Sequence, residues 1–132
     1  MSLRRVDAPG LFPGAPYHYA TVAGSGDLVF AAGACPLDEA GEVVDGPDIP
    51  AQAGRCVANL LTALEAAGAG FDDVLKTTVY VASDDRADLV RAWDVIAEAF
   101  GDARPPSTLL GVAMLGYAGQ LVELEAVALR RG

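Results

Sequence analysis

The stretch QLVELEAVALRR, residues 120–131, determines the fold more than any other part of the sequence. Successive side chains of a β-strand point to opposite faces. One face of this strand is wholly apolar and carries Val122, Leu124, Ala126 and Ala128. The other face combines apolar and acidic side chains, namely Leu121, Glu123, Glu125, Val127 and Leu129. The stretch therefore predicts a strand covered on one face, whose two carboxylates need a partner, water or a function.

Composition predicts one globular domain over residues 1–132, with more apolar surface than a domain of this size can bury. The chain has 132 residues, of which 52% are hydrophobic, and its mean hydropathy is +0.32. A single small domain has difficulty hiding that much apolar surface, which favours an oligomer. The net charge of -9 and the pI of about 4.3 oppose binding to a phosphate backbone, so we expect no nucleic-acid partner.

The sequence contains neither a metal-binding pattern nor a targeting segment. Two cysteines, Cys35 and Cys56, are too few for a disulfide framework or a zinc site, and we interpret both as small buried apolar residues. Arg4 and Arg5 precede no apolar run, and no segment is long enough to span a membrane. We therefore expect a cytoplasmic protein with no membrane association, no metal and no cofactor.

Proline, glycine and alternating apolar residues divide the first third of the chain into short elements. We predict an irregular arm over 1–16, strands over 17–23, 28–32 and 42–44, and turns over 24–27 and 38–41. The turn over 24–27, Gly-Ser-Gly-Asp, has the character of a hairpin connection between its flanking strands.

Helical spacing dominates the middle of the chain. A helix is predicted from Pro50, which suits a first turn, to a stop at Gly68. A second helix is capped by Ser83 and stopped by Gly101. The remaining strands are predicted over 74–82, 107–115 and 120–131. This order of elements predicts an α+β fold, with one sheet and two helices on one of its faces.

Three motifs resemble the RidA/YjgF/UK114 family. They are GACPLD at 33–38, AGAGFDDVLKTTVYV at 67–81 and VELEAVA at 122–128. The resemblance implies a chorismate-mutase-like α+β fold with one mixed sheet. It also implies a homotrimer with a central barrel of sheets, helices outside and ligand clefts between subunits. Enzymes of this family hydrolyse enamines and imines derived from amino acids, releasing ammonia and a 2-keto acid without a cofactor.

The resemblance also implies site residues. Tyr17 matches the tyrosine that closes the family's pocket, and Glu123 matches the glutamate that positions the hydrolytic water. The family's arginine, which pairs with the substrate carboxylate, is absent. Ser107 stands at that position when the alignment is counted from Gly111-Val112, and Pro106 stands there when it is counted from the proline pair. The chain therefore resembles a divergent member of this family, one that lacks the arginine.

Two further residues are candidates for the same cleft. Trp93 stands where many relatives have asparagine. Arg104 follows the second helix, where a cation is favourable without any ligand, but its side chain could also serve as a displaced anion clamp. His18 is the only histidine, and we interpret it as an exposed strand residue, with general acid or base chemistry as the alternative.

Each candidate also has a structural interpretation that needs no ligand. Glu123 and Glu125 can be solvated or paired acids of the barrel, and Tyr17 can be a packing aromatic with a hydrated hydroxyl.

Two functions follow from these residues. The first is a RidA-like protein that binds a small metabolite at the subunit cleft, with weak or altered hydrolytic activity. The alternative is a 2-iminobutanoate/2-iminopropanoate deaminase. Because no guanidinium is present at the clamp position, the sequence predicts poor binding of carboxylate substrates and easier binding of neutral or cationic ligands. Whether the protein is an enzyme stays open at this point.

Overall fold

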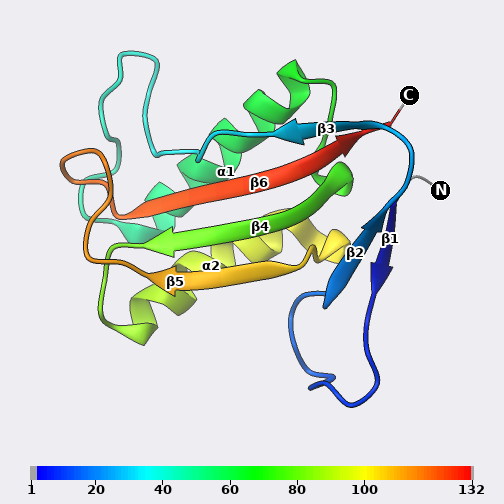
Figure 1. Cartoon of the computed structure of the whole chain (residues 1–132). Helices are drawn as coiled ribbons and strands as arrows, with labels where there is room; N and C mark the ends of the chain where they lie inside the picture. Colours follow the sequence, from blue (N-terminus) through cyan, green and yellow to red (C-terminus); the bar gives the residue numbers. More distant parts are fainter. Residues whose placement is uncertain (1–2, 132) are drawn as a thin grey trace.

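The computed structural model describes residues 3–131. The strands are β1 (Leu3–Val6), β2 (Ala20–Ala23), β3 (Asp27–Phe30), β4 (Val74–Val81), β5 (Ser107–Gly111) and β6 (Val122–Arg130). The helices are α1 (Ile49–Ala66) and α2 (Arg86–Phe100), with short 3-10 turns at Phe71–Asp73 and Gly101–Ala103. Figure 1 shows how these elements are arranged.

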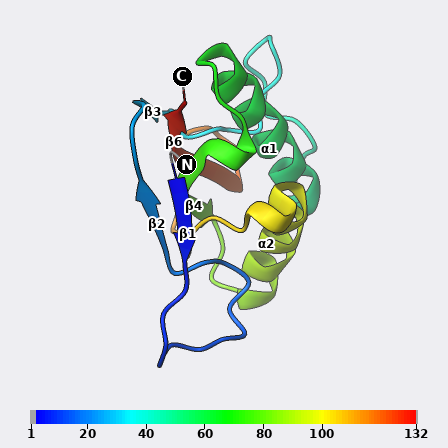
Figure 2. The ribbon, with the colours of Figure 1, turned by 90° about the vertical axis from the view of Figure 1, so that its right-hand side faces the viewer.

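Four strands form one mixed sheet in the order β3-β6-β4-β5. Strand β6 is antiparallel to β3 and to β4, whereas β4 and β5 run parallel. Both helices lie against the same face of this sheet, as Figure 2 shows edge-on. The α+β class and the two helices on one face are thereby confirmed. Within residues 3–131, no helix covers the opposite side of the sheet, and we call this side the open face.

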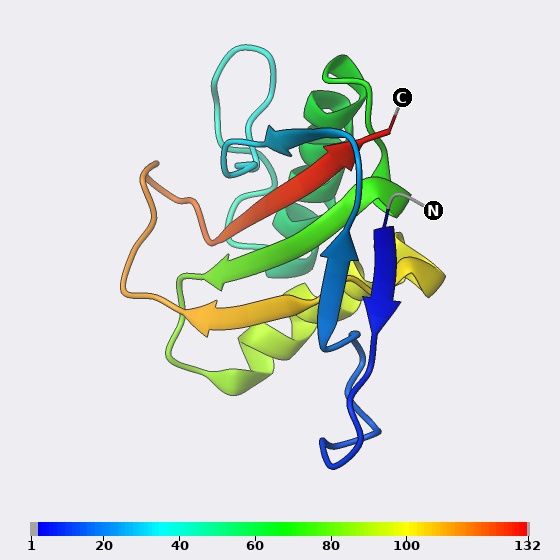
Figure 3. The ribbon, with the colours of Figure 1, turned by 45° about the vertical axis from the view of Figure 1, so that its right-hand side comes forward.

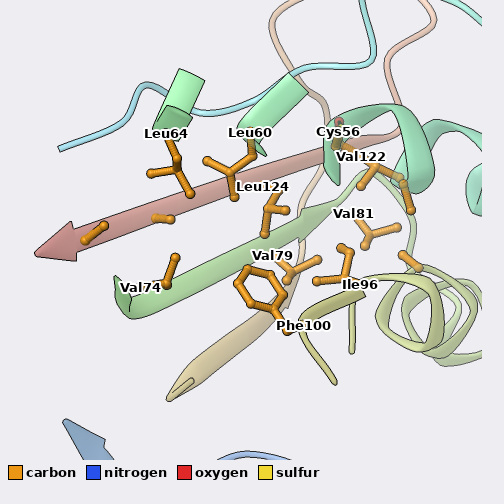
Figure 4. Packing of buried hydrophobic residues seen from close by; sticks show 14 of the residues in the cluster. Cys56, Leu60, Leu64, Val74, Val79, Val81, Ile96, Phe100, Val122 and Leu124 are labelled. Carbon is orange, nitrogen blue, oxygen red and sulfur yellow. Dashed lines mark hydrogen bonds between the residues drawn. The ribbon is translucent and has the colours of Figure 1, made fainter. Parts of the chain in front are cut away.

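The apolar face of β6 forms the middle of the core. All four of its predicted residues are at most 1% exposed: Val122, Leu124, Ala126 and Ala128. They belong to one core cluster with residues of three other elements, which include Leu60 and Leu64 of α1, Val79 of β4, and Ile96 and Phe100 of α2. Figure 4 shows Val122 and Leu124 of β6 among these side chains. The period-two pattern at 122–128 therefore identified the covered face correctly.

The ends of the helices follow local chemistry. The Asp48 side chain accepts a hydrogen bond from the Ala51 N–H at the start of α1, and Pro50 lies in its first turn. The predicted stop at Gly68 has φ +84°, a left-handed conformation that glycine adopts without strain. The predicted cap of α2 was wrong. Asp85, not Ser83, accepts from the Ala87 N–H.

The arm over 1–16 is not irregular throughout, because its residues Leu3–Val6 form β1. This strand pairs with β2 in a separate two-stranded sheet, and Figure 3 shows the pair beside the beginning of β4. Arg5 anchors the pair by donating to the carbonyls of Val74 and Ala103. The strand was missed because it contains two adjacent arginines, and because the carbonyls that fix Arg5 lie far along the chain.

The turn over 24–27 does not make the predicted hairpin. Strand β2 pairs with β1, and β3 pairs with β6, so the turn carries the chain from one sheet to the other. The short strand expected at 42–44 is also absent, since only a single bridge forms there, between Leu37 and Val43. Strand β5 stops at Gly111, four residues before the predicted end at Leu115.

Candidate functional site

Glu123 lies on the open face of the sheet, near the beginning of β6. Its partner across the ladder is Tyr80, and the next acid along the strand, Glu125, pairs with Thr78. The Tyr80 hydroxyl donates to Glu125 Oε1 over 3.1 Å. Desolvation, together with this hydrogen bond, raises the pKa of Tyr80. The Glu125 carboxylate therefore has a hydrogen-bond donor within its own chain. The donors to Glu123 come from other parts of the chain.

Two donors hold the carboxylate of Glu123 in place. Gln120 Nε2 donates to Glu123 Oε1 over 3.1 Å, and Cys35 Sγ donates to the same oxygen over 3.4 Å. Gly33 makes room for the second oxygen, since a Cβ at position 33 would lie 2.1 Å from Oε2. The glycine of the GxxPLD motif therefore allows the chain to approach this carboxylate closely.

Buried glutamines fix the segment that precedes β6. Gln120 is 3% exposed, and its Nε2 also donates to the Val122 carbonyl. Gln52 of α1 is fully buried; it donates to the Gly119 carbonyl and accepts from the Leu121 N–H. These bonds connect the core helix to the residues that orient Glu123. Sequence reasoning missed both glutamines, although a glutamine on the apolar stripe of α1 is a signal in itself.

Cys35 belongs to the Glu123 cluster and is not the buried apolar residue that the sequence predicted. It is half-buried, whereas Cys56 is fully buried as expected. Burial and the Glu123 carboxylate raise the pKa of the Cys35 thiol to about 11. The thiol therefore stays protonated at neutral pH and acts as a hydrogen-bond donor to Glu123.

A second group of predicted residues meets at the outer edge of β5. Tyr17, Trp93 and Ser107 line one cleft of about 530 Å³, together with Pro16, Thr108 and Leu109. The rings of Tyr17 and Trp93 are perpendicular, with their centroids 6.3 Å apart. We call this hollow the edge cleft. A larger open hollow of about 760 Å³ at the end of β5 is lined by none of the predicted site residues.

Ser107 and Arg104 are both fixed by neighbours. The Ser107 Oγ accepts from the Thr77 hydroxyl over 2.6 Å. Arg104 donates to the Ala15 carbonyl over 3.4 Å and accepts the His18 N–H on its own carbonyl. Arg104 lines a small cavity of about 20 Å³ next to the edge cleft, with which this cavity shares Trp93 and Ser107. In this arrangement Arg104 ties the N-terminal arm to the domain.

Next to the edge cleft, a second recess of about 490 Å³ lies between β2 and the sheet. It shares Tyr17, Ser107 and Thr108 with the edge cleft and also contains Lys76 and His18. Lys76 Nζ donates to the Thr108 hydroxyl over 3.3 Å. His18 forms an exposed contact of 3.1 Å with Asp7. Sequence reasoning passed over Lys76, although it is the only lysine in the chain.

The two groups of site residues lie on opposite faces of the sheet. Ser107 pairs with Thr77, whose buried side chain faces the helices. Glu123 pairs with Tyr80 on the open face. Directly paired residues project to the same face of a sheet, so one chain does not bring Glu123 into the edge cleft.

The part of the chain from 3 to 131 contains no group of three or more His, Cys, Asp or Glu side chains placed to hold a metal ion. Neither α1 nor α2, the helices of the described residues, is long and apolar enough to cross a lipid bilayer.

The fold and this site define a Rid-type α+β domain, and sequence comparison assigns the family. The model of the family described as "Endoribonuclease L-PSP" matches residues 11–130. A RutC family protein of Pyrococcus horikoshii is 38% identical over 117 residues, which cover 88% of each chain. The chain therefore belongs to the RidA/YjgF/UK114 family.

Other relatives extend the comparison to a named enzyme and to solved structures. The 2-iminobutanoate/2-iminopropanoate deaminase of Salmonella typhimurium is 32% identical over 108 residues, 80% of this chain and 82% of the enzyme. The Rid family protein YyfB of Yersinia pestis, described as of unknown function, superposes with a TM-score of 0.90 at 30% identity, covering 98% and 99% of the two chains. A Mycobacterium tuberculosis member of the YjgF/YER057c/UK114 family gives a TM-score of 0.66 at 32% identity, covering 97% and 99%.

Proposed function

We propose that this protein is a homotrimer that binds a small metabolite in clefts between its subunits and hydrolyses imines only weakly. The observation that carries the proposal is the composition of the edge cleft. Tyr17, Trp93 and Ser107 meet there, and the Ser107 oxygen accepts a hydrogen bond from Thr77. Counted from Gly111-Val112, Ser107 stands at the position of the family's arginine; counted from the proline pair, Pro106 does, and neither side chain carries a guanidinium.

A trimer would supply the acid that each cleft lacks within its own chain. Because Glu123 lies on the face opposite Ser107, a neighbouring subunit is the natural source of a carboxylate for the cleft. The open face supports such an assembly, since Phe30 is 74% exposed and Leu28 is 57% exposed. Apolar side chains gathered on one side of a sheet are typical of a subunit interface.

The missing guanidinium explains why hydrolysis would be weak. A small 2-imino acid that enters a cleft beside Glu123 loses water and meets a like charge. A charge-assisted hydrogen bond contributes about 1.5–3 kcal/mol. Without it, such a substrate is expected to bind about ten- to a hundredfold more weakly and without a fixed orientation.

The alternative function is that of a 2-iminobutanoate/2-iminopropanoate deaminase. It is favoured by the retention of Glu123, whose Oε1 accepts hydrogen bonds from both Gln120 and Cys35. A carboxylate held in this way can position a water molecule for attack on an imine carbon.

Ammonia release from freshly generated 2-iminopropanoate separates the two functions. The Salmonella typhimurium deaminase serves as the reference enzyme in the same assay. We expect the present protein to be at least tenfold slower. A comparable rate that is lost in Glu123→Gln would favour the deaminase, and a comparable rate that survives this substitution would remove Glu123 from the site.

A further inference from the structure

We infer that the edge cleft and the recess next to it together take a ligand made of a flat ring and one acidic group. The ring lies against Trp93 in the edge cleft, and the acid reaches past the shared residues Ser107 and Thr108 to Lys76 in the recess. The inference rests on the proposed function, because it names the class of metabolite for the same cleft. It uses two features that the family resemblance did not supply, the Trp93 ring that meets Tyr17 and a lysine ammonium in the recess next to the cleft.

The aromatic corner favours a planar apolar body. Tyr17 and Trp93 meet edge to face, and Tyr19 continues the cluster with its ring centroid 5.8 Å from that of Tyr17. Pro16 and Leu109 complete apolar walls around a volume of about 530 Å³. Metabolite sites commonly have this size and an apolar lining. A ring that enters this corner can stack on one wall and meet the other with its edge, as aromatic pairs prefer.

The polar groups at the other side of the cleft are donors. The Ser107 oxygen accepts from Thr77, and the Thr108 oxygen accepts from Lys76, so each hydroxyl keeps its own proton to donate. Lys76 adds an ammonium group, and within residues 3–131 it forms no ion pair. Donors and a cation together select an acceptor group with negative charge.

Lys76 changes the ligand charge that we expect the cleft to prefer. That prediction, of neutral or cationic ligands, rested on the lack of a cation at the clamp position. The ammonium lies 3.3 Å from a hydroxyl that lines the cleft and so supplies a local positive charge in a chain of net charge -9. A lysine is a point charge without the two-pronged geometry of arginine. It therefore attracts an acid without orienting it, and the ring has to provide the orientation.

A binding experiment with three matched probes tests both features. The probes are phenylacetate (ring and charge), acetate (charge only) and phenylacetamide (ring only). Trp93 is the only tryptophan in the chain, so its fluorescence reports the cleft directly, and isothermal titration calorimetry gives the affinities. We expect phenylacetate to change the Trp93 emission and to bind at least tenfold more tightly than either other probe.

Two substitutions assign the effect to the named residues. Lys76→Met should reduce phenylacetate binding to the level of phenylacetamide, whereas Arg55→Met, which removes an exposed cation from α1, should leave it unchanged. Trp93→Leu should weaken phenylacetate by at least tenfold and leave acetate unaffected. Lys76 is exposed, so its variant keeps the inference testable even where Trp93→Leu fails to fold.

Equal affinities for the three probes, or phenylacetate binding that is unchanged in Lys76→Met, would overturn this ligand class. Neither result bears on the subunit assembly or on the slow release of ammonia, so the proposed function would stand. Failure of the proposed function is recognised separately, by a monomeric protein or by rapid deamination.

Discussion

The Glu123 carboxylate accepts hydrogen bonds from the Cys35 thiol and the Gln120 amide, and no sequence motif indicated either contact. The sequence identified Glu123 because two acids interrupt an otherwise apolar strand. It could not identify Cys35, which lies 88 positions away along the chain and reaches Glu123 only through the bridge between Ala34 and Leu124. Gln120 was missed because the prediction treated it as the ordinary first residue of a strand. Contacts of this kind depend on the register of the sheet, which a local pattern does not contain.

The Cys35 thiol should be unreactive until the pH is high. Its pKa is raised to about 11, and the thiolate is the form that reacts. The alkylation rate with iodoacetamide should therefore rise with pH through about 11, not through the ordinary value of about 8.5. Glu123→Gln removes the negative charge beside the thiol, so its midpoint should fall and the rate at pH 9 should increase.

Cys35→Ser is the control, because Cys56 is fully buried and should not react in the folded protein. A wild-type midpoint near that of a free thiol, or a rate that Glu123→Gln leaves unchanged, would contradict the geometry of this cluster.

At the scale of elements, the sequence predicted the helices and strands that show a regular spacing of apolar residues. It missed the strand that is fixed by contacts with other parts of the chain. The two helices, β4 and β6 were located within a few residues, because each has a covered face with a regular spacing. The pairing of β1 with β2 was missed. Strand β1 spans four residues, of which two are arginines, and it is fixed by bonds to residues near 74 and 103.

For the candidate site, the resemblance named residues that share one cleft but did not indicate the face of the sheet on which each one lies. Tyr17, Trp93 and Ser107 do meet at the edge cleft, as the resemblance implied for residues of one pocket. The position of Glu123 on the other face of the sheet was not foreseen. Consecutive residues of a strand alternate faces, but the relation between two strands depends on their pairing register, which the sequence alone left open.

The start of α2 gives a test of the corrected cap. Asp85→Ala should lower the free energy of unfolding by about 0.5–2 kcal/mol, because the Ala87 N–H loses its acceptor. Urea denaturation measures the change. Asp84→Ala removes the same charge from an exposed neighbour and should have a smaller effect. Equal losses in the two variants would show that charge, not capping, stabilises this end of the helix.

At the scale of the molecule, the open face of the sheet predicts assembly. We expect light scattering to give about three times the chain mass of 13.5 kDa. Phe30→Asp places a charge on this face, so it should shift the protein towards monomer while the domain stays folded. Val90→Asp is the matched control, because Val90 is 52% exposed on α2 on the other side of the molecule. A stable wild-type monomer at micromolar concentration would exclude the trimer.

The same acidic molecule should not bind RNA, whatever the family's descriptive name suggests. A net charge of -9 repels a phosphate backbone, and nucleic-acid binding normally depends on basic groups that release counterions. Fluorescence anisotropy with labelled single-stranded RNA should show no binding at micromolar protein. An affinity in the micromolar range that weakens with salt, from protein free of nuclease, would contradict this expectation.

The most direct test of the proposed site is ammonia release from 2-iminopropanoate. It is measured for the wild type, for Ser107→Arg, and for Ser107→Arg combined with Glu123→Gln. Ser107 lines the edge cleft beside Tyr17 and Trp93, so an arginine there can pair with the substrate carboxylate. We predict slow turnover by the wild type, an increase of about ten- to a hundredfold in Ser107→Arg, and loss of that gain in the double variant. Rapid wild-type turnover that persists in Glu123→Gln would contradict the placement of the site.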